Sequence, residues 1–114
     1  MHANEYQQQA QTYAVFPLED SGWDYLLSAL SEENGEFQSI FAKCARNGRE
    51  RNLTPEERGH AIKELGDLCW MIALSAKLLG TSLADVLSNN LNKLEERKRH
   101  GVIEGKGESV SARK

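Results

Sequence analysis

Residues 54–80 read TPEERGHAIKELGDLCWMIALSAKLLG, and this stretch decides the fold. Thr54 can cap a helix, Pro55 stands where a missing backbone N–H has no consequence, and Glu57 completes a capping box. Gly80 closes the stretch with a residue suited to the left-handed conformation that ends a helix. Apolar residues recur every three or four positions between these signals, which predicts one long helix.

Similar signals predict three more helices on either side. A Gln-rich segment precedes a long apolar-periodic one that ends at Asn47-Gly48, and Ser82 opens a final helix that stops at Gly101. No segment alternates apolar and polar residues as a strand does. The connections are short, which is typical of antiparallel neighbours, so we expect an all-α antiparallel bundle of four to five helices. The predicted helices cover residues 4–15, 23–46, 55–79 and 82–100.

The composition limits the function. The chain has 114 residues, enough for one small domain whose core gains from oligomerisation. The net charge of −3 argues against a partner that is a nucleic-acid polymer, because such binders usually show a basic face. Cys44 and Cys69 form no CxxC motif and suit reduced packing thiols. The sequence contains no membrane-length apolar stretch, so we expect a cytoplasmic protein with no membrane partner.

Acidic residues interrupt the apolar stripe of the second predicted helix. That stripe consists of Leu26, Leu30, Phe37, Ile40 and Cys44. Glu33 occupies the slot between Leu30 and Phe37, and Glu36 follows three residues later. An i,i+3 pair places two carboxylates on neighbouring turns, roughly 5–6 Å apart at Cβ.

The third predicted helix repeats the anomaly. Its expected main stripe consists of Leu65, Cys69, Ile72, Ala76 and Leu79. Glu64 and Asp67 form a second i,i+3 pair at the edge of that stripe. One such pair is typical of a solvated helix face, but two pairs side by side would gather four carboxylates near a core, where like charges need compensation. The set contains oxygen ligands and neither His nor Cys, which favours Mg²⁺, with Mn²⁺ as a substitute.

These residues form part of a longer resemblance. Glu32-Glu33-Asn34-Gly35-Glu36, followed by Glu64-Leu65-Gly66-Asp67, resembles the EExxE…ExxD signature of the MazG-type all-α NTP pyrophosphohydrolases. Residues 90–97 are similar to the NxxKLxxR segment of that family, and residues 99–108 to the RxGxxxGxG(D) ending of a small single-domain branch, with Glu108 in place of the usual Asp. The resemblance predicts a domain over residues 1–108 and a flexible tail over residues 109–114.

The resemblance implies an activity and a set of site residues. The expected reaction is Mg²⁺-dependent hydrolysis of a nucleoside or deoxynucleoside triphosphate, by attack at the α-phosphate, to the monophosphate and pyrophosphate. Such an enzyme would control nucleotide pools, and a narrow preference such as one for dGTP is left open. The implied ligands of one to three metal ions are Glu33, Glu36, Glu64 and Asp67, with Glu32 assisting. Glu33 and Glu36 are equal candidates for orienting or deprotonating the attacking water. The implied phosphate ligands are Lys93, Arg97 and Asn90.

The sequence says less about the base-binding site and the oligomeric state. Tyr13, Phe16 and Trp23 flank the first predicted connection, where an aromatic ring can stack on a base, although aromatics near helix ends are commonly core residues. The resemblance also implies a homo-oligomer, a dimer or a tetramer, with sites built at subunit contacts.

Three other readings remain. The chain could be a non-catalytic helical module whose acidic face binds a partner. It could be a relative that hydrolyses phosphoribosyl-ATP, because similar carboxylate bundles do that work. Glu57-Arg58-Gly59-His60 reads ExxH, as in ferritin-like di-iron bundles, but that architecture requires two such motifs.

Overall fold

A computed structural model of the chain describes residues 1–15 and 22–101. Helices account for the regular structure of these residues, with no strand among them, so the all-α prediction is confirmed. The helix bounds agree with the predicted segments to within one or two residues, except that the first helix ends four residues early. The helices are α1 (Ala3–Gln11), α2 (Gly22–Arg46), α3 (Pro55–Leu78) and α4 (Leu83–Arg99).

The predicted signals fix both ends of α3. The Thr54 hydroxyl accepts a hydrogen bond from the backbone N–H of Glu57 at 3.1 Å, and the Glu57 carboxylate accepts one from the backbone N–H of Thr54 at 2.8 Å. Gly80 follows the helix with a φ of +76°, which L side chains rarely adopt. Because these contacts are local, the sequence contains nearly all the information that sets these boundaries.

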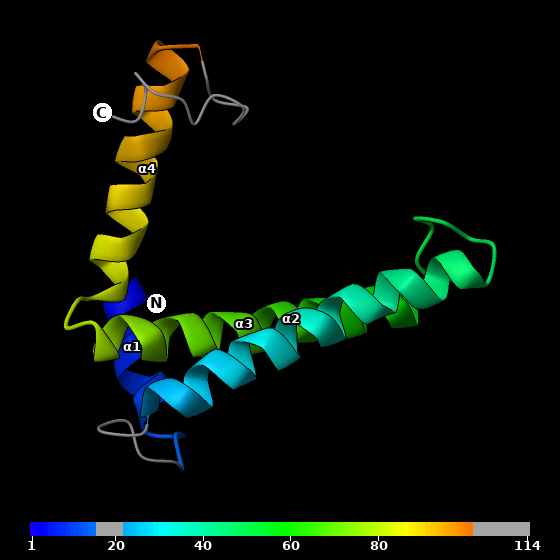
Figure 1. Cartoon of the computed structure of the whole chain (residues 1–114), viewed down its shortest axis with the longest axis horizontal. Coiled ribbons are helices and arrows are strands. Elements are labelled where there is room, and N and C mark those ends of the chain that lie inside the picture. The colour runs from blue at the N-terminus through cyan, green and yellow to red at the C-terminus, as the bar shows by residue number, and fades with distance from the viewer. Residues whose placement is uncertain (16–21, 102–114) are drawn as a thin grey trace.

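Helices α2 and α3 lie side by side as an antiparallel hairpin (Figure 1). Their shared core consists of Leu26, Ala29, Met71 and Leu74. Leu26 and Leu74 are fully buried. The α2 stripe is largely as predicted, since Leu26, Ile40 and Cys44 are buried and Leu30 and Phe37 are partly buried.

The predicted α3 stripe is wrong at every position except Ala76, which is buried. Leu65, Ile72 and Leu79 are 46%, 43% and 71% exposed, and Cys69 is exposed as well. In this single chain α2 packs instead on the face that carries Met71 and Leu74. Apolar residues occur on most sides of the second half of α3, so their spacing does not single out the buried side.

Helix α1 packs on α3 and contacts the start of α4. The Gln7 side chain is buried and donates a hydrogen bond to the Ala73 carbonyl oxygen at 3.2 Å. The same side chain accepts one from the backbone N–H of Leu83 at 2.9 Å, and Asn4 accepts one from Ala84 N–H at 3.0 Å. Two otherwise unpartnered donors at the start of α4 are thus satisfied by α1.

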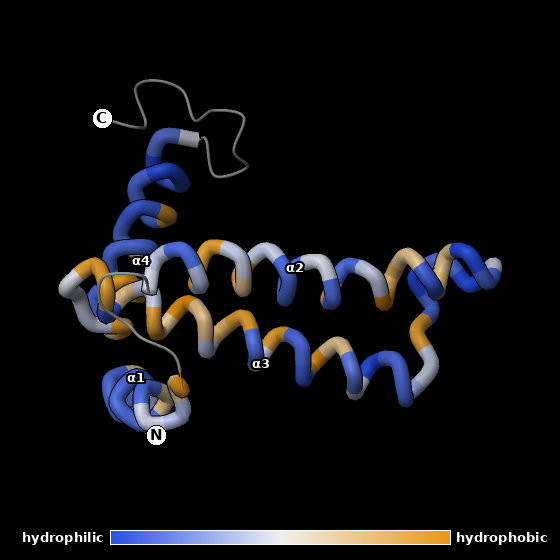
Figure 2. Tube along the Cα trace, turned by 60° about the horizontal axis from the view of Figure 1, so that its bottom comes forward, coloured by the Kyte–Doolittle hydropathy of each residue, from blue (hydrophilic) through white to orange (hydrophobic). Residues whose placement is uncertain are grey.

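Helix α4 projects from the hairpin at a bend of 100° to α3 (Figure 1). It contacts α1 and α3 near its start and, among the described residues, lies apart from α2. None of its residues is buried, and its outer half is mostly hydrophilic (Figure 2). The expectation of antiparallel neighbours therefore holds for α2 and α3 but not for α4. No single described helix is long and apolar enough to cross a membrane; the bent α3–α4 pair passes that test on length and composition alone.

Candidate metal centre and adjoining pockets

Acidic side chains from α2 and α3 meet, as the sequence predicts. Glu33 of α2 and Glu64 and Asp67 of α3 each offer a carboxylate oxygen, and these oxygens all lie within 4.8 Å of one another. Glu36, one turn after Glu33, is exposed and does not belong to this group of three. Glu32 is also exposed and outside the group. The hairpin therefore brings together three of the four predicted principal ligands.

Two oxygens of the cluster are buried without a hydrogen-bond partner. They belong to Glu33 and Glu64 (Oε1 in each), and Glu64 as a whole is only 8% exposed. The other Glu64 oxygen, Oε2, lies 3.3 Å from Nε2 of His60, one turn earlier on α3. Ionised carboxylates only accept hydrogen bonds, so neighbouring ones cannot satisfy one another. The cluster requires a proton or a cation.

The pKa of Glu33 reports this strain. Burial, as the largest cause, and the negative charges of Asp67 and Glu36 together raise it from 4.5 to about 7. Glu33 therefore holds a proton over a pH range in which a solvated glutamate has lost it. A divalent cation would relieve the same repulsion by replacing that proton.

The donor set fits a hard divalent cation. Carboxylate oxygens from two helices, with unpartnered lone pairs facing one another, are the ligands that Mg²⁺ and Mn²⁺ prefer. Mg²⁺ commonly uses only one or two protein carboxylates and leaves positions for water and substrate phosphate. The residues present are sufficient for such a site.

A pocket of about 380 Å³ opens beside the cluster, between α1 and α3. It is lined by Tyr6, Ala10, Tyr13, Gly66, Asp67 and Trp70. Asp67 thus belongs to both the pocket and the carboxylate cluster. Tyr13 was predicted from the sequence as a base-binding residue, but Tyr6 and Trp70 were not. The available signal was spacing, because Trp70 follows Asp67 by three residues on one helix.

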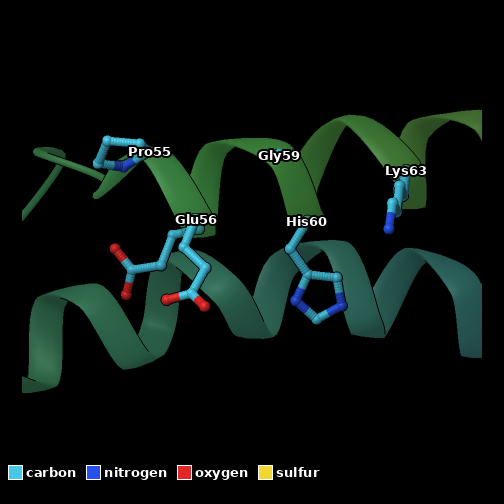
Figure 3. A pocket seen from close by; sticks show the side chains of 6 residues that line it. Pro55, Glu56, Gly59, His60 and Lys63 are labelled. Carbon is cyan, nitrogen blue, oxygen red and sulfur yellow. The ribbon is translucent and has the colours of Figure 1, made fainter.

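A second pocket, of about 500 Å³, lies at the start of α3. Figure 3 shows His60 and Lys63 extending from α3 beside Glu56. None of the predicted metal ligands lines this pocket. His60, which the sequence offered only as part of an ExxH motif, borders the pocket and reaches Glu64; the i,i+4 spacing of these two residues was the signal for that contact.

The predicted phosphate ligands lie on α4. Asn90 and Lys93 are exposed and Arg97 is partly buried. Because α4 is apart from α2 in the described part of the chain, one copy does not bring them to Glu33. Their phosphate-binding role stays a prediction.

The remaining predicted residues are dispersed. Trp23, in the first turn of α2, is 37% exposed and does not line the pocket beside Asp67. Phe16 lies outside the described residues, as does most of the predicted ending and the tail.

The fold and the cluster define a helical protein that gathers carboxylates from two helices into a site suited to a divalent cation. The sequence matches the MazG nucleotide pyrophosphohydrolase domain over residues 22–102, and the chain belongs to this family. It is 37% identical over 114 residues to the Gene 37 protein of Mycobacterium phage L5, covering 96% of this chain and 99% of the phage protein. No solved structure matches the chain significantly.

Proposed function

We propose that the protein hydrolyses nucleoside or deoxynucleoside triphosphates to the monophosphate and pyrophosphate, with Mg²⁺ as the required ion. Family membership supports the reaction class. The observation that carries the proposal is the meeting of Glu33, Glu64 and Asp67 within 4.8 Å, with two buried oxygens unpartnered. A strained acidic cluster of this kind is expected at a site that a cation completes.

The chain's own groups have distinct roles in this proposal. A water attacks the α-phosphorus, the bond from this phosphorus to the bridging oxygen breaks, and pyrophosphate leaves. Glu33 or Glu36 orients this water and accepts its proton; both remain candidates, and the raised pKa of Glu33 suits a group that exchanges a proton near neutral pH. Mg²⁺ bound by Glu33, Glu36, Glu64 and Asp67, with Glu32 assisting, would neutralise phosphate charge.

The leaving pyrophosphate needs positive charge. Lys93 and Arg97 are one turn apart on α4, and Arg can grip phosphate oxygens in a bidentate manner. Asn90, on the same helix, is a further donor to phosphate or to a carboxylate. We propose that a second copy of the chain supplies these groups, because α4 leaves the hairpin at a bend of 100° to α3 and, among the described residues, does not contact α2, which carries Glu33.

Self-association as a dimer or tetramer is supported by exposed apolar surface. Leu65 and Ile72 of α3, Leu79 directly after this helix, and Leu87 and Leu91 of α4 are each at least 43% exposed. Large apolar residues grouped in this way on a small domain are typical of an interface.

The direct test is pyrophosphate release from a panel of NTPs and dNTPs, with and without Mg²⁺, with the products identified. The expected result is metal-dependent turnover that the double substitution Glu36→Ala/Asp67→Ala abolishes, with helical content unchanged. Turnover by that double variant would contradict the site, and no turnover on any nucleotide by the native chain would favour a non-catalytic acidic module. Phosphoribosyl-ATP belongs in the panel, because its preferential cleavage would reassign the substrate.

A mixing experiment tests the shared site. A Lys93→Ala/Arg97→Ala chain and a Glu36→Ala/Asp67→Ala chain should each be inactive alone. Unfolded and refolded together, they should regain activity, because some mixed assemblies would contain one intact site. No recovery, with mixed assemblies shown to form, would place both sets of residues in one copy.

A role in nucleotide pools follows from this reaction. Such an enzyme would act in the cytoplasm of a bacterium or of an infected host cell, and the likeness to a phage protein supports the second setting. The preferred base, for example guanine in dGTP, is for the same substrate panel to decide.

A further inference from the structure

The pocket between α1 and α3 is continuous with the carboxylate cluster, because Asp67 contributes to both. We propose that this pocket binds the nucleobase of the triphosphate, which stacks on Tyr6, Tyr13 and Trp70. The inference rests on the proposed function and deepens it, since it assigns the part of the substrate that lies away from the reacting phosphate.

Helix geometry sets the direction in which the nucleotide lies. Gly66 and Trp70 are one turn apart on the side of α3 that faces α1, whereas Glu64 faces α2. Asp67 lies between these two sides at about 100° per residue. Trp70 follows Asp67 by about 5 Å along the helix axis, a short step that the sugar of a nucleotide spans. An α-phosphate at the cluster therefore directs its base toward the aromatic side chains.

The pocket walls are held in place. The Trp70 indole Nε1 donates a hydrogen bond to the Ala10 carbonyl oxygen at 2.9 Å, which fixes the ring and ties α3 to α1. One turn before Ala10 on α1, the buried Gln7 side chain donates a hydrogen bond to the Ala73 carbonyl oxygen of α3 and so anchors the two helices. Rings carried on anchored helices bind a flat ligand with little loss of conformational entropy.

The chemistry of the walls suits a base better than a peptide or a second phosphate. Stacking on aromatic faces is available to every nucleobase, because each has a π-face. Tyr6 lines the pocket, and its phenol O–H can donate a hydrogen bond to a base edge. Tyr13 is 69% exposed, so its ring has a free face for stacking.

A second copy of the chain has a different docking surface available. Leu65 and Ile72, the exposed apolar residues of α3, lie roughly 140° to 160° around the helix from Trp70. A copy that covers them leaves the pocket open for a small ligand.

Gly66→Ala is the sharpest test. A Cβ at Gly66 would meet nothing within 4 Å in the chain, so the fold has room for the methyl group, and Ala is the better helix former. The methyl occupies the pocket wall, and we expect KM for the best nucleotide to rise ~10-fold or more, with kcat little changed and Tm equal to or above that of the native chain. The inhibition constant of inorganic tripolyphosphate, which has no base, should not change.

Gly59→Ala is the matched control. Gly59 lies on the same helix, a Cβ there also meets nothing within 4 Å, and the residue does not line the pocket. Its kinetics should equal those of the native chain. As a second variant, Tyr13→Ala removes an exposed ring and should weaken binding of a nucleoside monophosphate about fivefold to tenfold.

The outcomes separate the two levels of the proposal. Unchanged nucleotide KM in both pocket variants overturns the base assignment, as does an equal loss of tripolyphosphate inhibition, which would locate the effect at the cation. A changed oligomeric state with unchanged KM would assign the pocket to a second copy. If the native chain turns over no nucleotide, the proposed reaction fails. Equilibrium binding of nucleoside monophosphates with Mg²⁺ then decides the pocket: weakening by Gly66→Ala supports it, and no effect removes it.

Discussion

The α2–α3 hairpin holds acidic groups against a core, whereas α4 contacts α1 and α3 near its start and, among the described residues, buries none of its own side chains. Glu64 is 8% exposed and lies on the helix that supplies the fully buried Leu74. No residue of α4 is buried, and Lys93 is exposed. The buried charges therefore lower the stability of the hairpin, and a proton or a cation would offset that loss. Helix α4 has no such buried acidic cluster, and its proposed role in catalysis would require a second copy of the chain.

The largest expected effect is a loss of kcat/KM when a charged side chain is removed, and we expect this loss to be greater in the hairpin than in α4. Glu33→Gln keeps the shape of the side chain but removes a charge and a metal ligand, so kcat/KM should fall on the order of 10³-fold. Lys93→Ala removes one proposed charged contact to phosphate and should lower kcat/KM roughly 10- to 100-fold. Steady-state kinetics at saturating Mg²⁺ measures both. A loss for Lys93→Ala as large as that for Glu33→Gln would break the distinction.

Truncating a leucine should lower the free energy of unfolding by several kcal/mol more in the hairpin than in α4. Leu74 is fully buried, so Leu74→Ala should lower the free energy of unfolding by about 2–5 kcal/mol. Leu91 is 67% exposed, so Leu91→Ala should change it by less than about 0.5 kcal/mol in the monomer. Urea unfolding at low protein concentration measures both values.

A concentration series extends that comparison. If α4 takes part in an interface, the effect of Leu91→Ala should grow with protein concentration, because association stabilises the folded chain by mass action. A large effect of Leu91→Ala that does not depend on concentration would show that α4 packs within its own chain.

Local signals in the sequence predicted more of this molecule than its long-range arrangement. The bounds of α3 follow from neighbouring residues such as Thr54 and Glu57, whose hydrogen bonds span three positions. The meeting of the acidic residues could be predicted because Glu33 interrupts an apolar stripe. The direction of α4 could not be predicted, because it depends on contacts such as that of Gln7 with Leu83, across 76 residues. Tyr6 and Trp70 of the aromatic pocket were missed for the same reason, since they lie on α1 and α3, far apart in sequence.

The pH dependence of stability should reveal the strain in the hairpin. Burial, Asp67 and Glu36 raise the pKa of Glu33 from 4.5 to about 7, so between these values the folded chain holds a proton that the unfolded chain has lost. This contribution to stability is fully present below about pH 4.5 and is lost as the pH rises through about 7. Its size is at most about 3 kcal/mol, and solvent screening makes it smaller.

Unfolding of metal-free protein between pH 5 and 8 (roughly the window of this titration) measures the effect, with Glu33→Gln as the control. The native chain should lose stability relative to that variant as the pH rises. Mg²⁺ should restore stability more at the upper end of the range, because ligands must be deprotonated to bind it. Parallel pH profiles for the two chains would show that Glu33 is not under strain.

The smallest expected effect concerns the joint between the two regions. Helix α3 is capped by its own Thr54, but α4 is capped by Ser82 and also by Asn4 of α1, which accepts from Ala84 N–H. Asn4→Ala removes one cap at an exposed position and should lower the free energy of unfolding by about 0.5–1 kcal/mol. The location of the change matters more than its size. Hydrogen exchange should become faster at the start of α4 and stay unchanged in α3. The reason is that α4 is capped in part by Asn4 of a distant helix, whereas α3 is capped by the neighbouring Thr54. Thr54→Ala should give the reverse pattern. If Asn4→Ala increased hydrogen exchange equally in α3 and α4, the two helices would open together, and α4 would not be a unit that is stabilised separately from the hairpin.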